Sequence, residues 1–99
     1  MGAEKRGYHL SRLATADLEE IWLYSSETWS EEQADRYQND LVQAFLYLAS
    51  GVKIGRIVGI RDGYYKYAVG SHFIYYRFGS LRIEIIRVLH QKMDVSKQL

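Results

Sequence analysis

The spacing of apolar residues changes once along this chain, from a helical repeat to a strand repeat. Between Ala14 and Trp29 they recur at intervals of three and four, which places them on one stripe of a helix. A second helical pattern runs from Ser30 to Gly51. Beyond residue 63 the apolar residues alternate, which is typical of strands. The pattern therefore predicts two helices followed by several strands.

The ends of the second helix are marked by residues with known end preferences. Ser30 stands three positions before Gln33, which is the spacing of a capping box, and the glutamates between them suit the positive end of a helix. Gly51 is predicted to end the helix, because glycine readily adopts the left-handed conformation found there. We expect this helix to begin after Ser30 and to end at Gly51.

The two predicted helices are separated by only a residue or two, so we expect an antiparallel hairpin. The first helix presents an amphipathic stripe that consists of Ala14, Leu18, Ile21, Trp22, Ser25 and Trp29. The second presents Ala34, Tyr37, Leu41, Ala44, Phe45 and Leu48. Both tryptophans lie on the first stripe, and we interpret them as core anchors of the hairpin, not as a ligand cage.

Three segments of alternating character follow a glycine-spaced loop at residues 51–59, and we assign them as strands over residues 64–69, 72–78 and 81–89. The dipeptides Gly70-Ser71 and Gly79-Ser80 separate these strands, and two-residue turns of this composition predict an antiparallel meander.

A short run at residues 8–10 is expected to add an edge strand. The fold class is therefore predicted to be α+β, in the order β-α-α-β-β-β, with the helix hairpin packed on a curved antiparallel sheet. One domain is expected over residues 1–99, with residues 1–7 disordered.

Composition narrows the possible classes of protein. A chain of 99 residues with 47% hydrophobic content can close a single small core. It has no cysteine, which excludes disulfides and thiolate metal sites. No stretch approaches the roughly 20 apolar residues of a membrane span, and no signal-peptide core follows Met1. We therefore expect a cytoplasmic protein that makes no membrane contact.

The charges divide unevenly between the two halves of the chain. Residues 1–50 carry four basic and nine acidic side chains, whereas residues 51–99 carry nine basic and three acidic ones. The second half thus suits an anionic partner, either nucleic acid or an acidic protein segment. The alternative is that basic strands neutralise acidic helices within the same domain.

Five of the nine tyrosines lie between residues 64 and 76, where they suit either a strand or the stacking of bases.

Motifs that carry chemistry are sparse. The chain has no glycine-rich phosphate loop and no Ser-His-Asp set at a recognisable spacing. Its histidines, His9, His72 and His90, are too scattered to predict a metal site, so no metal and no cofactor are expected. His90 is the most promising of the three, because it follows the last apolar strand and is expected to be accessible and titratable.

The order and spacing of several short segments resemble ParE-type toxins of the RelE/ParE superfamily, which belong to type II toxin-antitoxin systems. The resemblance runs from about Tyr8 to Leu99. The matching segments are Leu10-Ser11, Ala16-Asp17-Leu18 with Ile21 and Tyr24, Gln33-Ala34 with Tyr37, Ile54-Gly55-Arg56, Arg61 with Gly63, Gly70-Ser71-His72 with Ile74 to Arg77, Arg87 to His90, and Met93-Asp94. Val52 stands near the position where the family commonly has a proline.

This resemblance implies a toxin that poisons DNA gyrase by stabilising cleaved DNA, without an enzymatic activity of its own. It implies a ParD-like antitoxin with a DNA-binding ribbon-helix-helix part and a C-terminal segment that wraps the toxin. An acidic segment would suit the basic second half, and the expected antitoxin contacts are Arg56, Arg61, Lys66 and Arg77. The expected target contacts lie in the tail and are His90, Lys92, Met93, Asp94 and Lys97. Direct binding of nucleic acid is expected only through the antitoxin complex.

The same resemblance leaves an enzyme as the alternative, because RelE-like relatives cleave messenger RNA on the ribosome without a metal. That chemistry needs a base, a phosphate clamp and an acid held close together. The candidate residues in this chain are His90, Arg87 and His72. Glu84 is not expected to serve as the base, because it lies on the last strand and is expected to pair across it. A non-toxic binding module is the third possibility.

Overall fold

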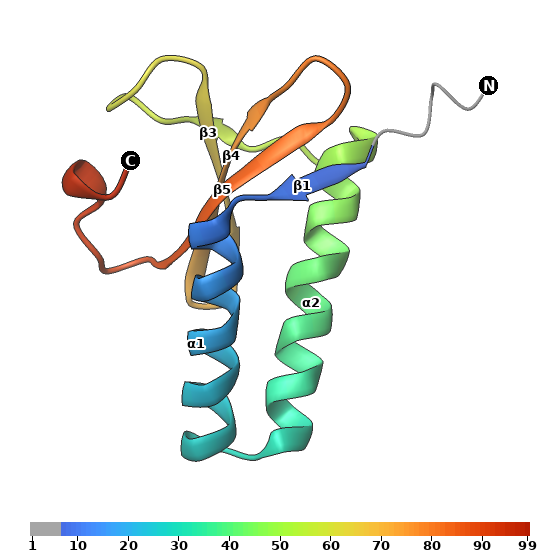
Figure 1. The fold of residues 1–99 in the computed structure, drawn as a ribbon, viewed down its shortest axis with the longest axis vertical. Helices are drawn as coiled ribbons and strands as arrows, with labels where there is room; N and C mark the ends of the chain where they lie inside the picture. Colours follow the sequence, from blue (N-terminus) through green and yellow to red (C-terminus); the bar gives the residue numbers. More distant parts are fainter. Residues whose placement is uncertain (1–6) are drawn as a thin grey trace.

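Two long helices pack against one face of a five-stranded sheet, as Figure 1 shows. The computed structural model describes residues 7–99, so the expected disorder of residues 1–7 lies, apart from Gly7, outside the described residues. The elements are β1 (Tyr8–Leu10), α1 (Arg12–Thr28), α2 (Glu31–Ser50), β2 (Arg56–Ile57), β3 (Tyr64–Val69), β4 (His72–Phe78), β5 (Ile83–His90) and the 3-10 turn η2 (Val95–Lys97).

The strand order is β1-β5-β4-β3-β2, which confirms the α+β fold with its helix hairpin. Strands β3 to β5 form the predicted antiparallel meander, and β2 pairs antiparallel with β3. Strand β1 runs parallel to β5, so the sheet is mixed. The expectation of a wholly antiparallel sheet is therefore wrong at this edge. The helix hairpin and the other three strands lie between β1 and β5 in the chain, and this long crossover permits a parallel pair. A second difference is β2, a short strand inside the segment predicted as loop.

The helix ends confirm the local predictions. The hydroxyl oxygen of Ser30 accepts a hydrogen bond from the backbone N–H of Gln33 at 3.0 Å. Gly51 follows α2 in the left-handed conformation, with φ of 84°. Ser11 caps α1 in the same way through Ala14 N–H at 3.0 Å, and its hydroxyl donates to the carbonyl oxygen of Ile86 at 2.7 Å. The start of α1 is thus fixed directly to β5.

The sheet has a main core on its helix side and a smaller cluster on its outer face. The main core joins Leu41 and Phe45 of α2 to Ile74 and Ile85 of the sheet, all fully buried. The outer cluster consists of Val58, Tyr75 and Leu89, with Tyr64, Phe73, Val95 and Leu99 packed against it. The C-terminal tail therefore covers part of the outer face.

The prediction that both tryptophans anchor the core is wrong for Trp29. Its side chain is 67% exposed, because it follows the last residue of α1, where the helix hairpin projects beyond the sheet (Figure 1). Trp22 is half-buried between the helices, and its Nε1 donates to a carboxylate oxygen of Asp35 at 2.8 Å. Of the two tryptophans, Trp22 is therefore the one that connects the helices.

The last strand begins two residues later than predicted, at Ile83. Leu81 stands in the turn and is 83% exposed, while the N–H of Gly79 donates to the carbonyl oxygen of Arg82 at 2.9 Å. The pairing of β4 with β5 also shifts between Tyr75 and Tyr76, which leaves Ile86 unpaired in a bulge.

No helix within residues 7–99 is long and apolar enough to cross a membrane.

Gly70 is the position in the β3–β4 turn where a side chain should be least tolerated. Its φ is +55°, and an added Cβ would lie 2.6 Å from the ring of Tyr37, whose hydroxyl is fixed by hydrogen bonds. We expect Gly70→Ala to lower the free energy of unfolding by at least about 2 kcal/mol in urea denaturation. Gly59→Ala is the matched control, because nothing lies within 4 Å of its added Cβ. Equal stability of the two variants would contradict this expectation.

Candidate functional site

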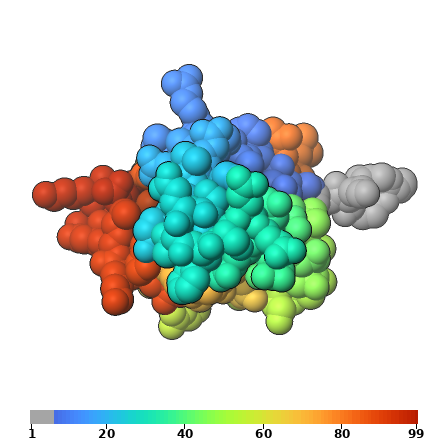
Figure 2. Space-filling model, turned by 90° about the horizontal axis from the view of Figure 1, so that it is seen from below, coloured from blue at the N-terminus to red at the C-terminus, as the bar shows by residue number. Residues whose placement is uncertain are grey.

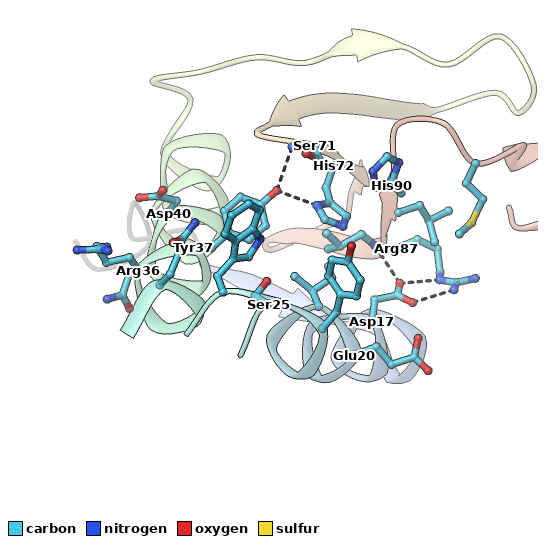
Figure 3. A pocket seen from close by; sticks show the side chains of 18 of the residues that line it. Asp17, Glu20, Ser25, Arg36, Tyr37, Asp40, Ser71, His72, Arg87 and His90 are labelled. Atoms are coloured by element: carbon cyan, nitrogen blue, oxygen red, sulfur yellow. Dashed lines mark hydrogen bonds and ion pairs between the residues drawn. The ribbon is translucent and has the colours of Figure 1, made fainter. Parts of the chain in front are cut away.

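A groove of about 1130 Å³ opens between the helix hairpin and the sheet, at the ends of β4 and β5 (Figure 3). Its helix wall includes Asp17, Tyr24 and Tyr37, and its sheet wall includes His72 and His90. Concave surfaces that combine aromatic residues with convergent polar groups are typical of binding sites. The groove is therefore one candidate binding surface of the described residues, beside the tail and the outer face of the sheet.

Tyr37 reaches from α2 to the β3–β4 turn and fixes the ring of His72 (Figure 3). Its hydroxyl donates to the carbonyl oxygen of Val69 at 2.9 Å and accepts from the N–H of Ser71 at 3.2 Å. Nδ1 of His72 lies 2.7 Å from the same hydroxyl oxygen. Because the single hydroxyl proton goes to Val69, we assign the donor role to Nδ1, which leaves the lone pair of the neutral ring on Nε2.

His90 stands beside His72 at the end of β5. The two residues are paired across β4 and β5, and their ring centroids lie 5.4 Å apart in an edge-to-face arrangement. Nδ1 of His90 accepts from the backbone N–H of Lys92 at 3.1 Å, so the proton of the neutral ring lies on Nε2. Nε2 of His72 can therefore accept a hydrogen bond, and Nε2 of the neighbouring His90 can donate one. Within residues 7–99 no three potential metal ligands of the His, Cys, Asp and Glu types cluster together.

Burial lowers the pKa of His72 below its ordinary value, because the imidazolium loses more solvation than the neutral ring. A positive charge on His90 also lowers the pKa of His72, whereas the negative charge of the Asp17 carboxylate raises it. Burial also raises the pKa of Tyr37, so its hydroxyl keeps its proton at neutral pH. The hydrogen bond between these two side chains therefore joins two neutral groups.

Arg87 is held by Asp17 where α1 borders the edge of β5. Its Nε and Nη2 donate to the two carboxylate oxygens at 2.8 and 2.9 Å, and both side chains are largely buried. These hydrogen bonds raise the pKa of the guanidinium. Asp17 also accepts from the N–H of Val88 at 3.0 Å, and Nη1 of Arg87 donates to the side-chain oxygen of Gln98 at 3.2 Å. One ion pair thus connects α1, β5 and the tail.

The tail after β5 folds back onto the sheet through Val95 and Leu99. Asp94, one of the predicted target contacts, caps η2 by accepting from the N–H of Ser96 at 3.0 Å, and this bond lowers the pKa of its carboxyl group. The predicted target contacts are all exposed, and they are His90, Lys92, Met93, Asp94 and Lys97. In Figure 2 the tail, in red, projects from the side of the molecule beyond α1.

The predicted antitoxin contacts lie away from the groove, on the outer face of the sheet. Arg56 is the cross-strand partner of Lys66, and Arg77 is the cross-strand partner of Tyr64. Arg61 lies in the loop before β3 and approaches the ring of Tyr64. The structure therefore brings these four cations to one region, which the sequence did not establish.

The three candidate ribonuclease residues are brought together only in part. His72 and His90 are neighbours, but the guanidinium of Arg87 is already engaged by Asp17 and Gln98. The expectation that Glu84 pairs across its strand is confirmed, because its Oε1 lies 2.9 Å from Nδ1 of His9 on β1.

Sequence reasoning missed the roles of Tyr37, Asp17 and Gln98 around these histidines. Tyr37 was placed on the buried face of its helix, where its hydroxyl needs a partner, and this need was the signal available. Asp17 lay off the apolar stripe and gave no such signal.

His72 makes the stability of the protein depend on pH. Because its pKa is lowered in the folded state, the unfolded chain binds more protons below the ordinary value of about 6.5. We expect the free energy of unfolding to fall as pH decreases through that value, and we expect His72→Gln to flatten this dependence. In an NMR titration the midpoint of His72 should lie below about 6.5, and His90→Gln should move it upward. A midpoint of His72 at or above 6.5 would contradict the assignment.

Known proteins similar to this chain are toxins. A family model described as "ParE toxin of type II toxin-antitoxin system, parDE" matches residues 8–95. Proteins named Toxin ParE1 from Caulobacter vibrioides and Mycobacterium tuberculosis are each 44% identical to it, and the alignments cover 93% of this chain and 96% of each relative.

A solved structure described as "Chromosomal ParDE TA system from P. aeruginosa" contains a chain with the same fold. Its TM-score is 0.76 at 20% identity, and the match covers 88% of this chain and 97% of that one. The fold, the family match and the close relatives agree: the chain belongs to the ParE toxin family of type II toxin-antitoxin systems.

Proposed function

We propose that this ParE toxin poisons DNA gyrase by stabilising cleaved DNA, and that a cognate antitoxin holds it inactive. The observation that carries the proposal is the family match over residues 8–95, together with relatives at 44% identity along almost the whole chain. A cytoplasmic location is part of the proposal, because gyrase acts on the chromosome. The toxin acts by contact and carries out no reaction of its own.

The antitoxin in this proposal is a ParD-like protein with a ribbon-helix-helix part and an acidic C-terminal segment. The outer face of the sheet supports such a partner, because Arg56, Lys66 and Arg77 are exposed or half-buried there. None of the three forms an ion pair with another residue of the described range 7–99. Carboxylates of the antitoxin would meet cations that the fold leaves uncompensated.

The gyrase contact in this proposal is the tail from His90 to Lys97. Met93 is 44% exposed and stands among Lys92, Asp94 and Lys97, which is the arrangement of an apolar contact within a polar rim. The tail is held in place by Val95 and by Gln98, so it presents these side chains with little loss of conformational freedom on binding.

A metal-independent ribonuclease is the second candidate, and the pairing of His72 with His90 favours it. An acceptor and a donor imidazole side by side could serve as base and acid. The phosphate clamp is the missing part, since Arg87 is engaged by Asp17. A non-toxic binding module is the third candidate.

Purified toxin incubated with gyrase, ATP and supercoiled plasmid should produce linear DNA that is covalently linked to protein. We expect Met93→Ala to raise the toxin concentration needed for half-maximal cleavage about tenfold, because a buried contact of this kind is worth about 1–2 kcal/mol. Leu81→Ala is the matched control, since Leu81 is an exposed apolar residue in the turn at the other end of β5.

Unchanged supercoiling and no cleavage at saturating toxin would rule out gyrase poisoning. The ribonuclease alternative predicts instead codon-associated cuts in messenger RNA on translating ribosomes, and His90→Ala should remove them. A chain that gives neither result, although it binds its antitoxin, is the non-toxic module.

A further inference from the structure

The outer face of the sheet combines fixed cations with aromatic rings. The ammonium of Lys66 lies 4.4 Å from the centroid of the Phe73 ring, and the guanidinium of Arg61 lies 4.9 Å from that of the Tyr64 ring. Contacts of this kind restrict long side chains to the surface of the sheet. Both cations are therefore partly ordered before any partner arrives, which reduces the entropy lost on binding.

Two further cations extend this group across three strands. Arg56 stands opposite Lys66 on β2, and Arg77 stands opposite Tyr64 on β4. Positions 64 and 66 are two residues apart on β3, so the two cross-strand pairs are separated by roughly 6.8 Å along the strand. We call Arg56, Arg61, Lys66 and Arg77 the basic face. Its width and spacing suit neighbouring phosphates of one extended nucleic-acid strand.

The acidic residues near the basic face do not neutralise it. Between residues 51 and 90 the chain holds seven basic and two acidic side chains. One of the acids, Glu84, is opposite Arg77, but its carboxylate is bonded to His9. The other, Asp62, is exposed in the loop and forms no ion pair within residues 7–99. The positive charge of this face is therefore available to an anion.

We infer that the basic face binds single-stranded DNA through its phosphates. A positive surface interleaved with aromatic side chains is the arrangement by which proteins hold single strands without reading their sequence. The resemblance to ParE toxins implied DNA contact only through the antitoxin complex, and the sequence does not show that these cations share one face. The strand register supplies that fact.

This inference rests on the proposed function in one respect, because it gives the antitoxin a way to act. An acidic antitoxin segment and a DNA strand would compete for the same cations. The toxin would touch the opened DNA within its target complex only after the segment has left. Neutralisation would then be direct competition for a phosphate-binding surface.

The test is fluorescence anisotropy of a fluorescein-labelled oligothymidylate of about 12 nucleotides, a length within the usual site size, titrated with the purified chain. We expect a Kd on the order of 10 µM at low salt, and a plot of log K against log salt with a slope of about −2 to −3, since each phosphate contact contributes about −0.7. Arg56→Gln and Arg77→Gln should each weaken binding at least about threefold and reduce the slope by about 0.7.

Arg12→Gln is the matched control, because it removes the same charge from α1 in the helix layer. Absence of binding at low salt would overturn the inference, as would equal losses in Arg12→Gln and Arg56→Gln. The inference would also be overturned if variants of the basic face no longer bound the antitoxin but bound DNA as tightly as before. The basic face would then be an antitoxin-binding site and not a DNA-binding site.

The DNA titration contains neither gyrase nor antitoxin, so it tests this inference independently of the proposed function. A chain that promotes gyrase cleavage but does not bind the oligonucleotide would refute this inference alone. A chain that binds the oligonucleotide but does not promote gyrase cleavage would refute the proposed function alone.

Discussion

The ion pair between Asp17 and Arg87 holds α1, β5 and the C-terminal tail together at the end of the molecule where the groove opens. Each carboxylate oxygen accepts from the guanidinium, and one of them also accepts from the N–H of Val88. Because β1 pairs with β5 only as far as Ile85, α1 takes the place of a neighbour strand at Val88. The same guanidinium donates to Gln98 and holds the tail. Removal of one partner of a largely buried pair leaves an unpaired charge, which typically costs about 3–5 kcal/mol.

Two surfaces of different character follow from this arrangement. The tail contacts lie beside the groove, where the histidines occupy the strand ends next to Arg87. The basic face lies on the opposite side of the sheet, away from α1 and α2. The proposed gyrase contacts in the tail and the proposed antitoxin contacts on the basic face are therefore different residues. A phosphate clamp at this position would require the guanidinium of Arg87 to leave Asp17.

Local chemistry made part of the fold predictable. Ser30 and Gly51 determine the ends of α2 through bonds to near neighbours, and the sequence shows both. The exposure of Trp29 was not predictable in this way, because periodicity gives the face of a helix but not the point at which the sheet beneath it ends. The proximity of His72 and His90 depends on the register of β4 and β5. The parallel pairing of β1 with β5 depends on contacts between residues at opposite ends of the chain. Neither has a local signature.

If Asp17 and Arg87 act as one unit that fixes α1, β5 and the tail, their substitutions should be energetically coupled in a double-mutant cycle. The free energy of unfolding would be measured in urea for Asp17→Asn, Arg87→Gln and the double variant. We expect each single change to cost about 3 kcal/mol, and the double change to cost less than their sum by at least about 1 kcal/mol. Losses that add within about 0.5 kcal/mol would contradict the account.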